Sequence, residues 1–259
     1  MAATCARAVE LGLPSVAFTE HVDHWRWRLG DDARLPGHWW PMVDDGVMAP
    51  RPFDVAGYLA EVERCRERFP SLRILTGIES GEPHRHPEAV RSVLRGGAFE
   101  RVLASVHAEP YGPPGEWRDV GFGLGEGDPY AVLRRYLAEL RTLITTWDDF
   151  EVLAHIDYPL RYWPQAAAGP FDPAVVEDDV RETLRTLARA DRVLELNTRR
   201  PLEPVVLRWW REEGGRAISF ASDAHEPAAL ARGFREAAQV AAAAGFRGGA
   251  APHDFWVRA

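Results

Sequence analysis

The chain has 259 residues, enough for one large α/β domain or two small ones with a sizeable core. Its hydrophobic fraction of 46% and charged fraction of 27% are those of an ordinary globular protein, and its formal charge of −8 argues against a binder that neutralises nucleic-acid phosphates. Two cysteines exclude a disulfide framework and suit a reducing cytoplasm, and no apolar run reaches the roughly 20 residues that span a bilayer.

Short apolar runs alternate with helical stretches along the chain. The sequence predicts strands over residues 15–19, 72–79, 101–107, 150–156, 192–197 and 216–222. It predicts helices over residues 2–11, 54–69, 130–147, 173–190 and 227–244. Most of the predicted strands are apolar almost throughout, as in a parallel sheet that is covered on both faces. No linker or repeat divides the chain, so we expect a single domain over residues 1–259.

Two long loops interrupt this alternation, over residues 22–53 and 108–129. Loops of this length in a compact domain are usually functional or mobile. The first contains WRWR at residues 25–28, for which two interpretations stay open: these side chains line a substrate pocket, or they form a hydrophobic lid.

Five of the predicted strands end in, or run directly into, a residue that can bind a metal. These residues are His21, Glu79, His107, His155, Asp223 and His225. A single His or Glu at a strand end is more often a polar residue of the loop, but five such positions on parallel strands would meet at one face. A mixed histidine and carboxylate set suits Zn, Mn or Fe, and a carboxylate can bridge two ions. The set therefore favours a metal site.

Other polar residues near these strand ends are expected to play lesser roles. Glu20 either binds metal or orients His21, and we favour orientation; Asn197 ends a strand and is expected behind the ligands. His84 and His86, in EPHRHP, resemble a metal pair, but they lie past the strand end beside prolines, so a rim loop is expected. His24, in the first long loop, is expected at the surface or in packing.

The motifs FTEH, GIE, SVH, AHID, LELNT and SDAH, in this order, resemble the PHP (polymerase and histidinol phosphatase) superfamily, and TEH, SVH and ELNT are most similar to its histidinol-phosphatase branch. The resemblance covers nearly the whole chain. It implies a distorted seven-stranded, TIM-like α/β barrel with two or three clustered divalent ions. It assigns the six residues above as metal ligands, with Glu79 as the bridge. It also places Arg161 at the substrate phosphate, whose oxygens match a guanidinium fork.

One family motif is absent: the His-x-His of the opening strand. We therefore expect the first barrel strand and up to three ligands to be missing from this chain, through a truncated or mis-started sequence. The expected consequences are fewer bound ions, imperfect closure of the barrel or loss of activity.

The resemblance implies hydrolysis of a small phosphomonoester, L-histidinol phosphate. Arg161 would hold the phosphate, and Asp223 or His225 would pass a proton to the leaving alkoxide. Two alternatives stay open: a phosphoesterase acting on a nucleotide or another phosphoester, and a degenerate PHP domain that binds metal without turnover. Neither nucleic acid nor membrane is expected as a partner, and the oligomeric state is not predicted.

Overall fold

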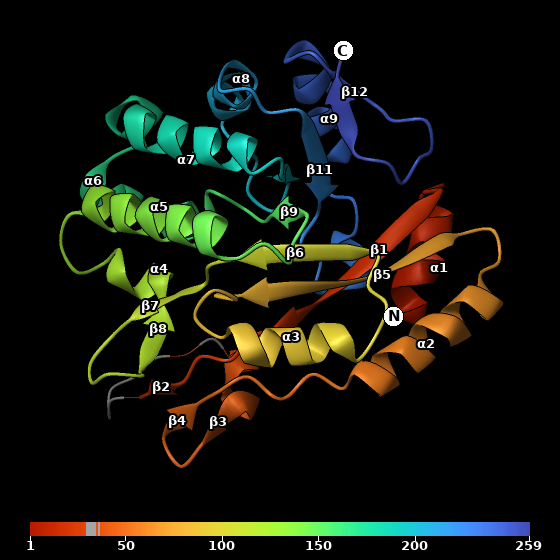
Figure 1. Cartoon of the computed structure of the whole chain (residues 1–259), viewed down its shortest axis with the longest axis horizontal. Coiled ribbons are helices and arrows are strands. Elements are labelled where there is room, and N and C mark those ends of the chain that lie inside the picture. Colours follow the sequence, from red (N-terminus) through yellow and green to blue (C-terminus); the bar gives the residue numbers. More distant parts are fainter. Residues whose placement is uncertain (30–34, 36) are drawn as a thin grey trace.

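The computed structural model describes residues 1–29, 35 and 37–259, and a mostly parallel sheet lies at its centre (Figure 1). The strand order is β1-β5-β6-β9-β10-β11-β13-β12. The parallel strands are β1 (Ser15–Val22), β5 (Arg73–Gly81), β6 (Arg101–Ser105), β9 (Val152–Leu153), β10 (Val193–Asn197) and β11 (Ala217–Ala221). β13 (Trp256–Arg258) pairs antiparallel with both β11 and β12 (Phe246–Arg247). All six predicted strands are therefore confirmed, and the fold is α/β.

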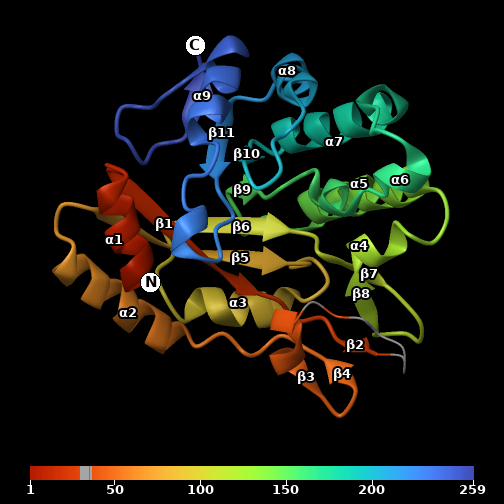
Figure 2. The same cartoon turned by 180° about the vertical axis from the view of Figure 1, so that it is seen from behind.

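The interior strands and β1 differ in what covers them. Every residue of β10, and every residue of β5 after Arg73, is buried, which explains their nearly continuous apolar runs. β1 ends the sheet on its side, and among the described residues it pairs with β5 alone. Figure 2 shows α1 (Ala2–Glu10) alongside β1 on this side of the molecule. Most β1 residues remain partly exposed, as expected for an edge strand.

Helices surround the sheet. The longer ones after α1 are α2 (Val55–Arg68), α3 (Pro87–Arg95), α5 (Pro129–Thr146), α7 (Glu177–Arg189), α8 (Pro204–Glu212) and α9 (Phe234–Ala243). Asp54 caps α2 as the sequence predicts, because its side chain accepts a hydrogen bond from the Gly57 amide at 3.0 Å. α5 buries one apolar face, from Val132 to Ile144, in the main hydrophobic core. None of the helices in the described part of the chain could cross a membrane.

Some helix boundaries differ from the prediction. The stretch 227–244 is broken: η4 (Pro227–Ala229) ends before α9 begins, and Ala231 and Gly233 between them have φ values of 55° and 72°, outside helical geometry. The stretch 173–190 starts as η3 (Pro173–Val176) before α7 begins. α3 and α8 were not predicted, although each starts with a proline in its first turn, a position that favours a helix start.

The two long loops fold against each other near the carboxyl ends of the strands. Their elements are β2 (Trp27–Arg28), η1 (Gly37–Met42), β3 (Val43–Asp44), β4 (Val47–Met48), β7 (Ala108–Pro110), β8 (Trp117–Asp119) and α4 (Val120–Gly123). Trp25, Trp27 and Met48 form a buried cluster with Ala108 of the second loop. The tryptophans of WRWR are thus packing residues of a hydrophobic cap. Residues 30–34 and 36 of the first loop lie outside the described residues.

Candidate metal centre

The carboxyl ends of neighbouring strands bring the predicted ligands together. His21 of β1 lies directly opposite Glu79 of β5 in the parallel register. His107 follows β6 by two residues, and His155 follows β9 by two residues. Since the strands are parallel, all four side chains reach the same edge of the sheet.

The first group of donor atoms consists of Glu79, His107 and His155. Glu79 Oε1 lies 2.8 Å from His155 Nε2 and 3.1 Å from His107 Nε2. The two Nε2 atoms are 3.4 Å apart. All three residues are buried, and their donor atoms lie within 4.8 Å of one another. Two imidazoles and one carboxylate at this spacing fit a transition-metal ion such as zinc.

A second group shares His107 and adds Asp23, which the sequence analysis did not select. Asp23 Oδ2 lies 3.2 Å from His21 Nδ1, and Asp23 Oδ1 lies 3.3 Å from His107 Nδ1. Gly81 makes this possible, because a Cβ at Gly81 would lie 1.9 Å from Asp23 Oδ1. A carboxylate two residues after His21 in TEHVDH was the available signal, since alternate strand residues share a face.

Neighbouring charges and burial set the protonation of the residues in the two groups. Burial alone would raise the pKa of Glu79, but His155 and His21 hold it well below its usual range. Burial lowers the pKa of His155, which favours the neutral imidazole that binds metal. Asp23 and Glu79 instead outweigh burial and raise the pKa of His107. Glu79 and Asp23 likewise raise the pKa of His21 to about 9, so a metal ion would replace protons on these two rings. The centre therefore offers an ionised carboxylate beside one imidazole, His155, whose neutral form is favoured.

Asp223 and His225 lie next to these groups without belonging to either of them. Asp223 forms an ion pair with Arg161 Nη2, and its Oδ1 lies 3.5 Å from Arg199 Nη1. Burial would raise the pKa of Asp223, but Arg161 lowers it. The His225 side chain is 59% exposed, and its ring centroid lies 5.7 Å from that of His21. This side of the centre combines one carboxylate with two cations.

Arg161 is held in place by aromatic contacts. It lies in η2 (Tyr158–Tyr162), which precedes the short α6 (Gln165–Ala168), and its guanidinium carbon is 4.8 Å from the Tyr158 ring centroid. The Tyr158 hydroxyl donates to Asp119 Oδ2 at 2.5 Å. Arg199, which the sequence analysis also missed, is 49% exposed and less constrained.

Behind the centre lies a buried pair, Glu195 and Asn197. Glu195 Oε1 accepts hydrogen bonds from the His155 amide at 3.1 Å and from Asn197 Nδ2 at 2.8 Å. Burial and the charge of Glu79 raise the pKa of Glu195 to about 8. Asn197 Nδ2 also lies 3.4 Å from Asp223 Oδ2, so it links the two sides of the centre. Glu20 is exposed, and the carboxylate that contacts His21 is Asp23.

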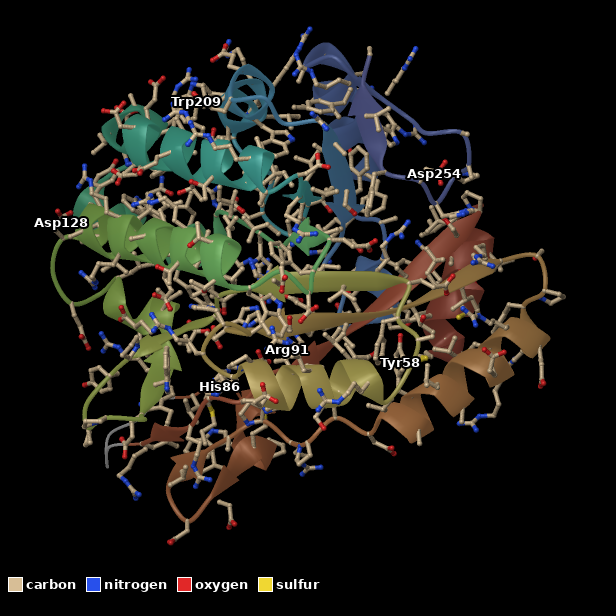
Figure 3. All side chains as sticks on the ribbon, viewed as in Figure 1. Tyr58, His86, Arg91, Asp128, Trp209 and Asp254 are labelled. Carbon is tan, nitrogen blue, oxygen red and sulfur yellow. The ribbon has the colours of Figure 1, made fainter. Side chains whose placement is uncertain are left out.

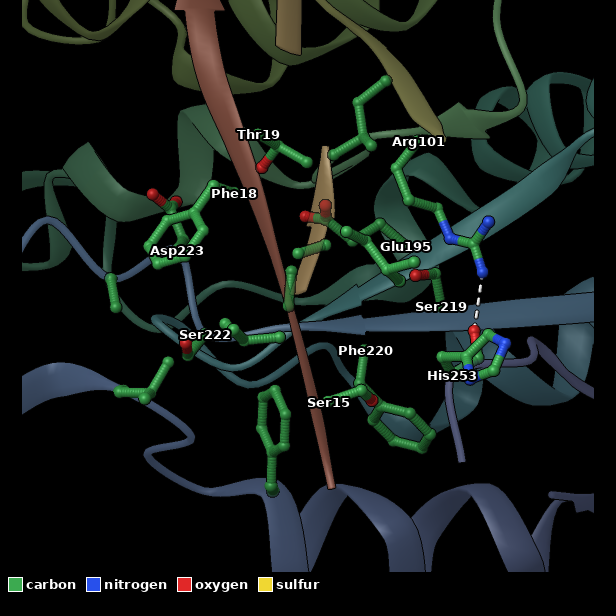
Figure 4. A pocket seen from close by; sticks show the side chains of 18 of the residues that line it. Ser15, Phe18, Thr19, Arg101, Glu195, Ser219, Phe220, Ser222, Asp223 and His253 are labelled. Atoms are coloured by element: carbon green, nitrogen blue, oxygen red, sulfur yellow. Dashed lines mark hydrogen bonds between the residues drawn. The ribbon is translucent and has the colours of Figure 1, made fainter. Parts of the chain in front are cut away.

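A cleft of about 760 Å³ opens beside the centre, between β1 and β11. Its lining includes five of the six predicted ligands, with His107 the exception. Figure 4 shows Asp223 on one side of this cleft, and Arg101 bonded to the His253 carbonyl oxygen on the other. A small molecule in the cleft can reach the candidate metal ligands that line it and Asp223, the ion-pair partner of Arg161.

The fold and the site define a class: α/β proteins with a histidine and carboxylate metal centre at the carboxyl ends of parallel strands. A family model described as the PHP domain matches residues 1–199, and the chain belongs to this family.

Two relatives within this similarity carry the name histidinol-phosphatase. The chain is 25% identical over 226 residues to "Histidinol-phosphatase" of Lactococcus lactis subsp. lactis, which covers 84% of this chain and 75% of the relative. It is 27% identical over 207 residues to "Probable histidinol-phosphatase" of Clostridium acetobutylicum, which covers 73% of each.

One solved structure confirms the fold. It is histidinol phosphate phosphatase from Lactococcus lactis subsp. lactis, complexed with zinc, L-histidinol and phosphate. The match has a TM-score of 0.76 and 22% identity, and it covers 95% of this chain and 87% of that one.

Proposed function

We propose that this protein is a metal-dependent phosphatase that hydrolyses L-histidinol phosphate to L-histidinol and phosphate. The observation that carries the proposal is the pair of donor groups that share His107. An open cleft beside them is lined by Asp223, the ion-pair partner of Arg161. The names of the two relatives support the choice of substrate.

The ligand set would be His21, Asp23, Glu79, His107 and His155, completed by Asp223 and His225. The donors suit Zn, Mn or Fe, and we expect two or three ions, of which the two groups that share His107 would hold two. When bound, such ions neutralise phosphate charge and lower the pKa of a nearby water.

The chain's own residues would bind and orient the phosphate. Arg161 presents a guanidinium fork that can leave Asp223 and hold two phosphate oxygens. In the reaction, a water oxygen bonds to phosphorus as the bond from phosphorus to the histidinol oxygen breaks. Asp223 or His225 would take the proton that the attacking water loses and pass it to the leaving alkoxide. Asn197 would hold the carboxylates of Glu195 and Asp223 in place through its two hydrogen bonds. Glu20 would help to orient His21 without binding a metal ion.

We place this reaction in the cytoplasm, because both cysteines are free and buried. The substrate is a small phosphorylated molecule, since the net charge of −8 disfavours a polyanion such as nucleic acid.

The test is phosphate release from L-histidinol phosphate and from a panel of nucleotides and other phosphomonoesters, with added Mn, Zn or Fe. We expect the highest kcat/KM for L-histidinol phosphate and its loss on chelation. A preference for a nucleotide would change the substrate but retain the phosphatase. No turnover of any substrate, with metal bound, would leave a PHP domain that binds metal without catalysis.

A further inference from the structure

Three histidines form a second cluster outside the candidate metal centre. His24 directly follows Asp23, and His84 and His86 lie in the turn between β5 and α3. The ring centroids of His24 and His86 are 5.8 Å apart. Within the centre the corresponding distance is 5.2 Å for His21 and His107 and 5.7 Å for His21 and His225. The His24 and His86 rings therefore have nearly the spacing of the inner ones.

Each of these histidines has a buried nitrogen without a partner among the described residues. The atoms are His24 Nε2, His84 Nδ1 and His86 Nε2. A buried polar atom without a hydrogen bond destabilises the fold, so native structures rarely leave three together. A bound ion would satisfy all three.

His84 has the hydrogen bond that is typical of a metal ligand. Its Nε2 lies 2.7 Å from Glu139 Oε1 of α5, and its side chain is only 2% exposed. Arg85 fixes Glu139 with two further bonds of 2.8 Å. Metal-binding histidines almost always donate their second nitrogen to such a carboxylate, which fixes the ring and leaves the other nitrogen free for the ion.

The surroundings suit an ion held by neutral imidazoles. Burial lowers the pKa of His86, and positive charge on His24 or His84 would lower it further, so the free nitrogen keeps its lone pair. The Trp117 ring lies 6.1 Å from the His86 ring and shields the cluster on that side. Figure 3 shows His86 at the N-terminal end of α3.

We propose that His24, His84 and His86 bind one further transition-metal ion of the zinc type, separate from the ions of the candidate centre. Among the described residues, only the two inner groups have three donor atoms already within 4.8 Å of one another. Since Glu139 holds the His84 ring, the rings of His24 and His86 would turn towards it to close around the ion. Since His24 belongs to the first long loop and the other two to the β5–α3 turn, the ion fastens the cap to the sheet next to Asp23.

Zinc content per chain tests the proposal, because it does not require turnover. The purified full-length chain is equilibrated with zinc, freed of excess by dialysis and measured by inductively coupled plasma mass spectrometry. We expect His86→Gln and His84→Gln each to hold one equivalent less than the wild type. His253→Gln, which removes a histidine elsewhere, should match the wild type. Glu79→Gln should lose inner zinc but retain the outer equivalent.

Equal zinc in the wild type and in folded His86→Gln and His84→Gln would overturn the proposal. Circular dichroism identifies a variant that has not folded. Should both variants fail to fold, an anomalous difference map, measured at the zinc edge from wild-type crystals, shows whether zinc is bound at the outer site. A peak among the three rings supports the site; a peak at the inner groups alone refutes it.

Discussion

The two sides of the candidate centre show how the same sequence pattern produces different environments. Glu79 lies in an interior strand, His107 and His155 follow two others, and all three are buried and contact one another within 3.4 Å. Asp223 and His225 follow β11, which borders the cleft, and Asp223 is paired with arginines. Glu79 and His155 also line the cleft, but they are buried and held by each other. Asp223 is held instead by arginines, which can exchange it for a bound molecule. We therefore infer that the interior side holds metal and the cleft side handles substrate.

Glu79→Gln should have the largest effect, because it removes the charge shared by the interior side. The amide cannot balance His21, His107 and His155 in the same way or bridge two ions. We expect kcat/KM for L-histidinol phosphate to fall by at least about 10²–10³-fold, together with bound metal. Glu20→Gln is the matched control, since Glu20 is exposed and adjacent to His21. Similar losses in both variants would contradict the proposed division.

Arg161→Ala tests the cleft side. We expect a fall in kcat/KM of roughly 10²-fold with metal content unchanged, because a preorganised cation at the phosphate is lost. Arg199→Ala should cost less, as Arg199 is 49% exposed and 3.5 Å from Asp223. Steady-state kinetics and metal analysis of both variants provide the comparison. Loss of metal in Arg161→Ala would show that the two sides are not separable.

The sequence predicted the interior side better than the cleft side, for physical reasons. Strands that are covered on both faces have apolar runs, so their ends, and the ligands at Glu79 and His155, can be recognised. The contact of Asp23 depends on the missing side chain of Gly81, and the partner of Asp223 comes from a separate segment of the chain. The C-terminal hairpin of β12 and β13 has strands of only two and three residues, too short for a periodic signal.

Gly81→Ala should damage the interior side without changing a ligand. The new Cβ would fall 1.9 Å from Asp23 Oδ1 and 3.2 Å from His107 Nδ1, so Asp23 must move. We expect the free energy of unfolding to fall by about 1–3 kcal/mol, with weaker zinc binding measured by calorimetry. Gly125→Ala is the control, because its Cβ would meet only the Phe122 carbonyl oxygen at 3.9 Å. Unchanged zinc affinity in Gly81→Ala would exclude Asp23 as a ligand.

Glu139→Gln should have the smallest effect, and this effect on the free energy of unfolding depends on pH. Glu139 forms ion pairs with His84 and Arg85. Burial would raise its pKa, but His84 and Arg85 lower it to about 2 from an unfolded value of 4.5. Because the folded pKa is depressed, the ionised carboxylate stabilises the fold above pH 4.5, and this stabilisation is lost as the pH falls towards 2. We expect Glu139→Gln to lower the free energy of unfolding by roughly 1–2 kcal/mol at neutral pH, allowing for partial exposure. Urea unfolding of both proteins between pH 7 and about pH 3 measures the difference, which should shrink as the solution becomes more acidic. A difference that stays constant over this range would mean that Glu139 acts through packing, and His84 would then lack the charged partner expected of a metal ligand.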